Sequence, residues 1–101
     1  MQVKNLYLKI NNRRNEMSHI RAEIILDKTT DVAEFVRLVN READHFIIEN
    51  EDCSLSVDAK SYLGVFYASA DFKSPLYLVN KDNDGQFPMF VDAYRCMNNN
   101  L

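Results

Sequence analysis

The sequence predicts a single α+β domain in which one four-stranded, mostly antiparallel sheet is covered on one face by three helices. Four short segments have the alternating or continuous hydrophobicity of strands, and three other segments have apolar residues at helical spacing. The resulting order is β-α-β-β-α-β-α. A βαβ unit split by an additional strand builds an open sheet with its helices on one face. The length of 101 residues suits one domain.

The chain divides into an N-terminal extension, residues 1–16, and a domain, residues 17–101, with Met17 as a candidate natural start. Two readings of the extension stay open, because the window is too short to decide between them. Helical spacing relates Val3, Leu6, Tyr7 and Ile10, whereas strand-like alternation relates Leu6, Leu8 and Ile10.

The domain begins with a strand and a helix. Alternation predicts a half-buried strand through Ile20, Ala22, Ile24 and Leu26. Asp31, followed by Glu34 three residues later, predicts a variant of the capping box at the start of the helix. The helix is expected to end near Arg41, and its apolar stripe consists of Val32, Phe35, Val36 and Val39.

A hairpin and a second helix follow. Residues 45–49 predict a strand with Phe46 and Ile48 on one face, and residues 53–57 predict the return strand with Leu55 and Val57 pointing inward. Asp58 is the expected cap of the second helix. The buried side of this helix is expected to carry Tyr62, Leu63, Phe66 and Tyr67. In an alternative reading, the aromatic residues Tyr62, Phe66 and Tyr67 form an exposed recognition patch.

The last strand and helix complete the sheet and its cover. Residues 76–79 form a continuously apolar strand, and residues 80–85 form a turn that is expected to cap the last helix. Pro88 is tolerated in the first turn of this helix. Its apolar stripe is Phe87, Phe90, Val91 and Tyr94. We expect Val36, Leu63 and Phe90 to be buried between the helices and the sheet.

Composition argues against several classes of function. The net charge of −3 and the pI near 5.3 are atypical of nucleic-acid binding, which usually needs a basic face. No apolar run approaches the length of a membrane span, and no signal peptide is visible, so we expect a cytoplasmic protein without membrane insertion. Cys53 and Cys96 form no CxxC pattern, and His19 and His45 are expected to be plain surface or strand residues.

No bound group or reaction is indicated either. The run from Asn80 to Gly85 resembles half of a calcium-binding loop, but Val91 stands where a bidentate Glu is required. No nucleophile–base pair and no phosphate-binding Gly loop is visible. We therefore expect no metal, no cofactor and no enzymatic activity.

One segment carries a family resemblance. The run Ala59-Lys60-Ser61-Tyr62-Leu63-Gly64-Val65 resembles the Lys-Ser-aliphatic-Met/Leu-Gly-Val segment of the histidine-containing phosphocarrier (HPr) family of the bacterial sugar phosphotransferase system. Residues 36–49 are similar to the end of that family's first helix and its second strand. The resemblance covers about residues 18–97 and implies an HPr-like open-faced sandwich.

The resemblance fails at the family's reactive segment. In the family, a Gly-Leu/Ile-His-Ala-Arg-Pro-Ala run precedes the first helix, and its His receives a phosphoryl group from enzyme I. Counting back from Phe35 and Val36 places Lys28-Thr29-Thr30-Asp31 at the His-Ala-Arg-Pro positions. A Lys amine, with a reference pKa of about 10.4, is protonated and accepts a phosphoryl group poorly. Asp31 would also repel an incoming phosphate at the helix N-terminus.

The resemblance also implies a regulatory site and partners. In Gram-positive members of the family, the Ser that matches Ser61 is phosphorylated by a regulatory kinase. We expect a degenerate HPr-like module that binds phosphotransferase-system or regulatory proteins through Lys60, Tyr62, Leu63 and Phe66. Two alternatives stay open: an HPr-fold binding protein with a role unrelated to sugar transport, and a phosphocarrier that uses an unconventional residue.

Overall fold

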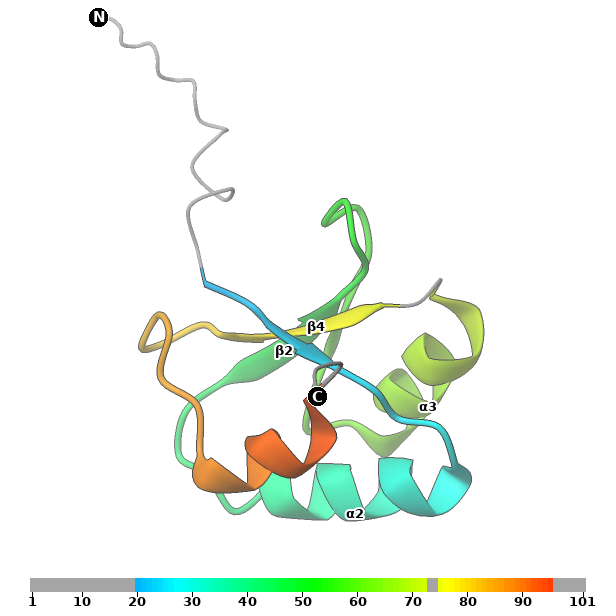
Figure 1. The fold of residues 1–101 in the computed structure, drawn as a ribbon, viewed down its shortest axis with the longest axis horizontal. Helices are drawn as coiled ribbons and strands as arrows, with labels where there is room; N and C mark the ends of the chain where they lie inside the picture. Colours follow the sequence, from blue (N-terminus) through cyan, green and yellow to red (C-terminus); the bar gives the residue numbers. More distant parts are fainter. Residues whose placement is uncertain (1–19, 73–74, 96–101) are drawn as a thin grey trace, which may run out of the picture.

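The computed structural model describes residues 20–72 and 75–95, which form a sheet with helices packed against one face (Figure 1). The order along the chain is β1 (Ala22–Ile24), α2 (Thr29–Val39), β2 (Phe46–Glu49), β3 (Ser56–Asp58), α3 (Tyr62–Asp71), β4 (Leu76–Asn80) and the 3-10 helix η2 (Met89–Tyr94). The α+β class and the predicted order of elements are therefore confirmed for the described residues.

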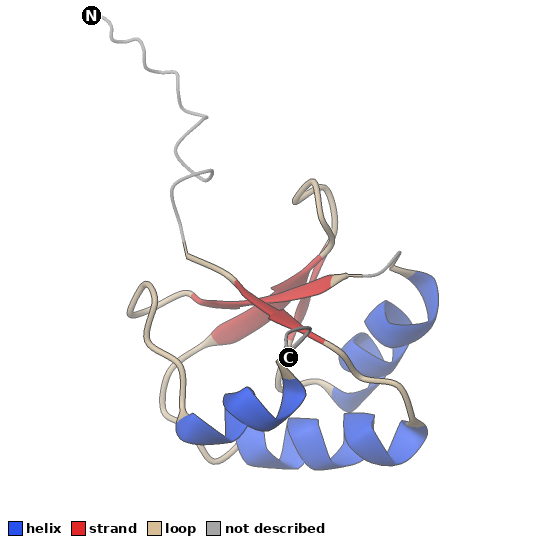
Figure 2. Cartoon of the chain, viewed as in Figure 1, coloured by secondary structure: helices blue, strands red, loops and turns tan. Residues whose placement is uncertain are grey.

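The four strands form one antiparallel sheet in the order β1-β4-β2-β3. Leu78 of β4 pairs with Ala22 on one side and with Ile48 on the other, and Ile48 pairs in turn with Val57. Ala22, Ile48 and Leu78 of this row belong to the buried core together with residues of α2 and α3, and the partly buried Val57 packs against that core. The helices cover this side of the sheet (Figure 2). The alternation correctly predicted the burial of Ala22, Ile24 and Leu26, and of Phe46 and Ile48. It was wrong for Ile20, which lies before β1 and is 54% exposed.

The start of α2 differs from the prediction. Lys28 is the N-cap, and its carbonyl oxygen accepts the first helical hydrogen bond from the Val32 N–H at 3.1 Å. Asp31 consequently lies inside the first turn and forms no capping box with Glu34. Its negative charge still favours this end of the helix dipole. The predicted stripe is confirmed, since Val32, Phe35, Val36 and Val39 are all buried.

The return strand of the hairpin is shorter than predicted, and Leu55 is exposed. Asn50 causes the difference: its backbone N–H donates to the Leu55 carbonyl, and its side-chain oxygen accepts from the Leu55 N–H, both at 3.1 Å. Cys53 adopts a φ of 65°, a left-handed conformation that closes this loop. Regular pairing with β2 begins only at Ser56.

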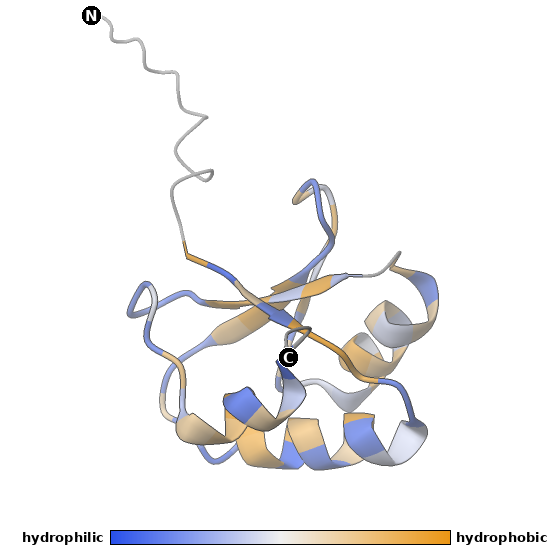
Figure 3. Cartoon of the chain, in the orientation of Figure 1, coloured by the Kyte–Doolittle hydropathy of each residue, from blue (hydrophilic) through white to orange (hydrophobic). Residues whose placement is uncertain are grey.

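The predicted buried face of α3 was wrong. Val65 and Ala68 face the core, whereas the large apolar residues face outward, with Leu63 77% exposed. Small residues allow the helix to approach the sheet closely, because a Cβ placed on Gly64 would lie 3.3 Å from Val57 Cβ. Almost every residue of α3 is apolar or small (Figure 3), so periodicity could not identify the inner face.

The last helix is also shorter than predicted. Pro88 is the N-cap of η2 and does not lie in its first turn, and Phe87 precedes the helix. Val91 is fully buried, whereas Phe90 is only partly buried. The Phe90 and Tyr94 rings pack edge-on against Phe35 of α2, with ring centroids 6.0 and 5.2 Å apart. The expected burial was therefore right for Val36 and wrong for Leu63, and the burial of Phe90 is partial.

Candidate functional site

Lys28 and Ser61 occupy equivalent positions on two neighbouring helices, since each is an N-cap. Lys28 caps α2 with an exposed side chain that makes no capping hydrogen bond. Ser61 caps α3, and its Oγ accepts a hydrogen bond from the Gly64 N–H at 3.0 Å. The predicted cap, Asp58, instead accepts a hydrogen bond from the Lys60 N–H at 2.9 Å, which forms a tight turn before the helix.

The two caps lie at opposite ends of the helical layer. Asn40, the C-cap of α2, donates through Nδ2 to the Lys60 carbonyl at 2.9 Å, which places the end of α2 beside the start of α3. At the other end, Asp27 lines the same pocket as Ser69 of α3. The helices therefore run antiparallel. The 11 residues of α2 therefore separate the caps by roughly 16 Å along the helix axis, at 1.5 Å per residue.

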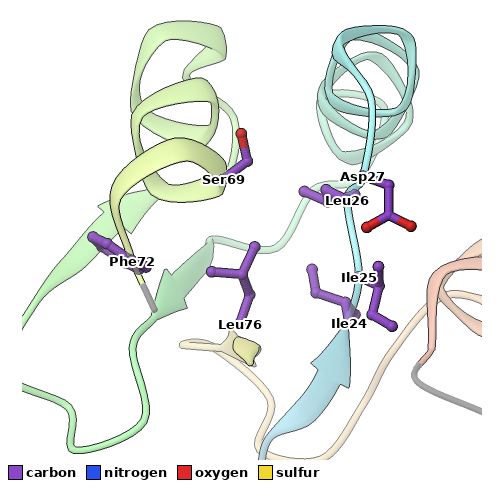
Figure 4. Close-up of a pocket in the computed structure, with 7 residues that line it drawn as sticks. All are labelled: Ile24, Ile25, Leu26, Asp27, Ser69, Phe72 and Leu76. Atoms are coloured by element: carbon purple, nitrogen blue, oxygen red, sulfur yellow. The ribbon is translucent and has the colours of Figure 1, made fainter. Parts of the chain in front are cut away.

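A small open pocket lies beside Lys28, between the chain after β1 and the end of α3 (Figure 4). Its volume is about 100 Å³, and its walls are residues 24–27, Ser69, Phe72 and Leu76. Most of these side chains are apolar, and Asp27 carries the negative charge among them. None of the described lining residues is a cation, and residues 73 and 74, between Phe72 and Leu76, lie outside the described part of the chain. The described walls form a small, mostly apolar gap between the chain after β1 and the end of α3.

Lys60 ties α3 to the end of α2. Its Nζ donates to the Glu42 carbonyl at 2.7 Å, while its own carbonyl accepts from Asn40. The side chain is half-buried and stabilises this junction. Lys60 was predicted as a partner contact; its amine is committed to Glu42 in the structure, and a role in binding stays a prediction.

The outer face of α3 exposes four large side chains, and we define the α3 aromatic face as Tyr62, Leu63, Phe66 and Tyr67. The three aromatic side chains are between 41 and 48% exposed. The Tyr62 and Phe66 rings stack, with centroids 6.1 Å apart and planes 16° from parallel. The first nine residues of α3 carry no charge, so nothing ionic interrupts this surface. Apolar patches of this kind often mark binding surfaces.

Sequence reasoning missed a cluster on the face of the sheet opposite the helices. Arg21 Nη1 lies 3.2 Å from Glu49 Oε1, and the Arg21 guanidinium lies 3.9 Å from the centre of the Tyr77 ring. Arg21 Nη1 also donates to the carbonyls of Asn50 and Glu51. Glu49 is thus a buried ion-pair partner. Arg21 and Glu49 flank Tyr77 of the intervening strand β4, a relation that requires the strand order.

Cys53 completes this cluster without becoming a nucleophile. Its Sγ donates to Glu49 Oε1 at 3.1 Å. Burial, followed by the hydrogen bond and the negative charge of Glu49, raises the pKa of the Cys53 thiol. A thiol with a raised pKa is protonated at neutral pH and reacts slowly. Cys53 is a free cysteine, whereas Cys96 lies outside the described residues.

The turn after β4 is fixed to the chain before β2 and does not cap η2. Asn80 is buried, and its Nδ2 donates to Asp44 Oδ2 and to the Gln86 carbonyl, both at 2.9 Å. Asn83 Nδ2 donates to the same Asp44 oxygen at 3.0 Å. These two amides lower the pKa of Asp44. Within residues 20–72 and 75–95, no group of three or more His, Cys, Asp or Glu side chains is placed to hold a metal ion.

The remaining predicted positions are the two histidines and the N-terminal extension. His45 is exposed at the start of β2, and His19 and residues 1–16 lie outside the described residues. Among the described helices, none has the length and apolar character needed to cross a membrane. Comparison of the chain with protein-family models, with curated proteins and with solved structures finds no match.

Proposed function

We propose that this chain is an HPr-like protein related to the phosphoenolpyruvate-dependent sugar phosphotransferase system. In this proposal it acts in the cytoplasm as a non-catalytic regulatory or interaction module. The α3 aromatic face carries the proposal, because an uncharged surface with a stacked Tyr62–Phe66 pair and an exposed Leu63 offers apolar contact area to another protein.

The local context of this face supports the family relation. The HPr-like segment, residues 59–65, coincides with the start of α3, and Ser61 is its N-cap. The strand pairing and the helices on one face are compatible with an open-faced sandwich. A phosphate on Ser61 would lie at the positive end of the helix dipole and beside Tyr62, where it would alter the charge of the docking surface.

The surroundings of Lys28 support a non-catalytic role. The residue caps α2 at the position that matches the family's phosphoacceptor His, but its flanking residues include Asp27, and Asp31 lies in the first helical turn. These two carboxylates lie at the N-terminus of α2, and their negative charges oppose the approach of an anionic phosphoryl donor. Binding without phosphoryl transfer is therefore the activity we assign.

Capture of partners with matched variants tests the proposal. Leu63→Asp places a charge in the α3 aromatic face, whereas Met89→Asp places one at a methionine of η2 that is 89% exposed. Neither side chain supports the core, so both variants should fold. We expect wild type and Met89→Asp to retain a phosphotransferase-system protein from the source cell and Leu63→Asp to lose it, with direct binding confirmed by titration of the purified partner.

Two other outcomes would change the conclusion. If Leu63→Asp retains every protein that wild type retains, the α3 aromatic face is not the docking surface and the proposal fails. If the protein lost with Leu63→Asp belongs to another pathway, the chain is an HPr-fold binding protein with a role unrelated to sugar transport.

A further inference from the structure

Carboxylates lie near both ends of the α3 aromatic face. Asp58 precedes the N-cap of α3, Asp71 is its last residue, and Asp27 lies beside Ser69 across the pocket at the same end. The amine of Lys60 is bound to the Glu42 carbonyl. An occupant of this face should therefore combine an apolar stripe with cationic flanks.

The N-terminal extension has this combination in its sequence. In the helical reading of the extension, Val3, Leu6, Tyr7 and Ile10 would share one face, and Lys4, Lys9, Arg13 and Arg14 accompany them in the sequence. Four cations and one anion, Glu16, give residues 1–16 a net charge of +3. Because the whole chain carries −3, residues 17–101 carry −6. The two parts of the chain therefore carry opposite net charges.

We propose that the apolar stripe of residues 3–10 docks on the α3 aromatic face of its own chain and competes there with the partner. Residues 11–19 connect the stripe to Ile20, the first described residue. Nine extended residues span about 30 Å, which is about the diameter of a domain of this size. Tethering at this length gives a local concentration of about millimolar, so a weak contact is enough to occupy the face.

The docking itself stands on the composition of the two surfaces, whereas its regulatory consequence rests on the proposed function. A partner that needs the α3 aromatic face binds only the undocked fraction of the molecules. If docked chains outnumber undocked chains tenfold, the apparent Kd of the partner rises about tenfold. The extension would then act as a built-in competitor at the site.

The test compares full-length variants by NMR. Leu6→Asp/Ile10→Asp disrupts the stripe, whereas Leu8→Asp places the same charge off the stripe. We expect the double variant to move the Leu63 methyl and Tyr62, Phe66 and Tyr67 ring resonances, and Leu8→Asp to leave them unchanged. Nuclear Overhauser contacts between the Tyr7 and Phe66 rings should appear in wild type and vanish in the double variant. Spectra should be the same after tenfold dilution.

Three results would overturn the inference. Unchanged α3 resonances in the double variant would show that the stripe does not dock there. An equal effect of Leu8→Asp would favour the strand-like alternation and exclude the helical stripe. A loss of the contacts on dilution would show that the extension binds a second copy.

Binding separates this inference from the proposed function. If the double variant binds a purified partner about tenfold tighter than wild type, and Leu63→Asp abolishes binding, both stand. If Leu63→Asp abolishes binding but the double variant binds like wild type, the partner site stands and competition by the extension fails. If no partner depends on Leu63, the proposed function fails, and the NMR comparison still decides whether the extension docks.

Discussion

Ser61 Oγ and the Gly64 N–H form the hydrogen bond that begins α3, at a distance of 3.0 Å. An N-cap side chain satisfies one of the four backbone donors that a helix leaves unpaired. Ser61 is thus both the residue that matches the family's regulatory Ser and a structural element of the helix it would regulate.

Substitution of Ser61 should separate these two roles. Ser61→Ala removes the cap and should lower the free energy of unfolding by about 1 kcal/mol, whereas Ser61→Asp keeps a good capping oxygen and should be nearly neutral. Urea unfolding measures both. Ser69→Ala is the matched control, because the Ser69 hydroxyl donates to the Phe66 carbonyl inside the same helix and supplies no cap. Equal losses for Ser61→Ala and Ser69→Ala would contradict the capping role.

The orientation of α3 predicts opposite effects of a charge on its two faces. Val65 and Ala68 are buried, whereas the large apolar residues that the sequence pattern placed inside are exposed. Val65→Asp buries a carboxylate in the core and should unfold the domain, because the cost of several kcal/mol approaches the total stability of a small protein. Leu63→Asp should leave the midpoint of unfolding nearly unchanged. Circular dichroism during urea titration distinguishes the variants, and cooperative folding of Val65→Asp would show that the helix is rotated from the orientation described.

Sequence patterns succeeded where polar and apolar residues differ and failed where they do not. α2 alternates charged and apolar residues at helical spacing, so its buried stripe was predictable. α3 is apolar around most of its surface, and its inner face is selected by small residues, Gly64 and Ala68, that fit against β3 and the core. That choice depends on the distance between helix and sheet, which no local pattern contains.

Some residues of the candidate site were predictable from the sequence, and others were not. Lys28 and Ser61 were selected because they match functional positions in the segments that resemble the HPr family. Both are N-caps in the structure. The cluster of Arg21, Glu49 and Cys53 depends on strand order. Glu49 and Cys53 follow Arg21 by 28 and 32 positions in the sequence, and they meet it only after β4 has paired between β1 and β2. Leu55 was misplaced because the side chain of Asn50 determines where the loop ends.

Cys53 should react slowly with thiol reagents, and Glu49 should be one cause. In a Cys96→Ser background at pH 8, alkylation of Cys53 should be slower than that of an unstructured peptide thiol. Glu49→Gln removes the negative charge next to Sγ, which lowers the pKa of Cys53 and should raise the alkylation rate roughly three- to tenfold. The variant should also lose about 1–3 kcal/mol of stability, because it leaves Arg21 without its carboxylate.

A matched variant shows whether unfolding explains faster alkylation of Cys53. Val57→Ala is destabilising but leaves the ion pair intact, because Val57 packs against the core on the other face of the sheet. Alkylation should accelerate much more in Glu49→Gln than in a Val57→Ala variant of similar stability. Equal acceleration in the two variants would assign the protection to burial alone.

Asp44 should contribute stability that depends on pH in the acidic range. Hydrogen bonds from Asn80 and then Asn83 lower its pKa in the folded state. A carboxyl group of this kind stabilises the fold above its unfolded pKa, and the contribution disappears as pH falls through the lower folded pKa. Asn83→Ala removes one donor from an exposed residue, so NMR titration should show the pKa of Asp44 moving up toward its ordinary value. An unchanged Asp44 titration would show that Asn83 does not hold the carboxylate in solution.

Lys28 leads to the last prediction, which concerns phosphoryl transfer. Incubation with enzyme I and labelled phosphoenolpyruvate should leave no acid-labile phosphate on the wild-type chain. Lys28→His supplies an imidazole at the N-cap of α2 but leaves Asp31 in the first turn, where a carboxylate opposes an incoming phosphate. Labelling of Lys28→His should therefore stay low and should increase when Asp31→Pro is added. The proline fits the first turn, because the backbone N–H that it removes has no helical partner there.

Labelling of wild type that is lost in His19→Ala or His45→Ala would show that the acceptor lies elsewhere and that the chain is a phosphocarrier. Strong labelling of Lys28→His alone would show that the missing imidazole, and not the acidic surroundings, is what prevents transfer.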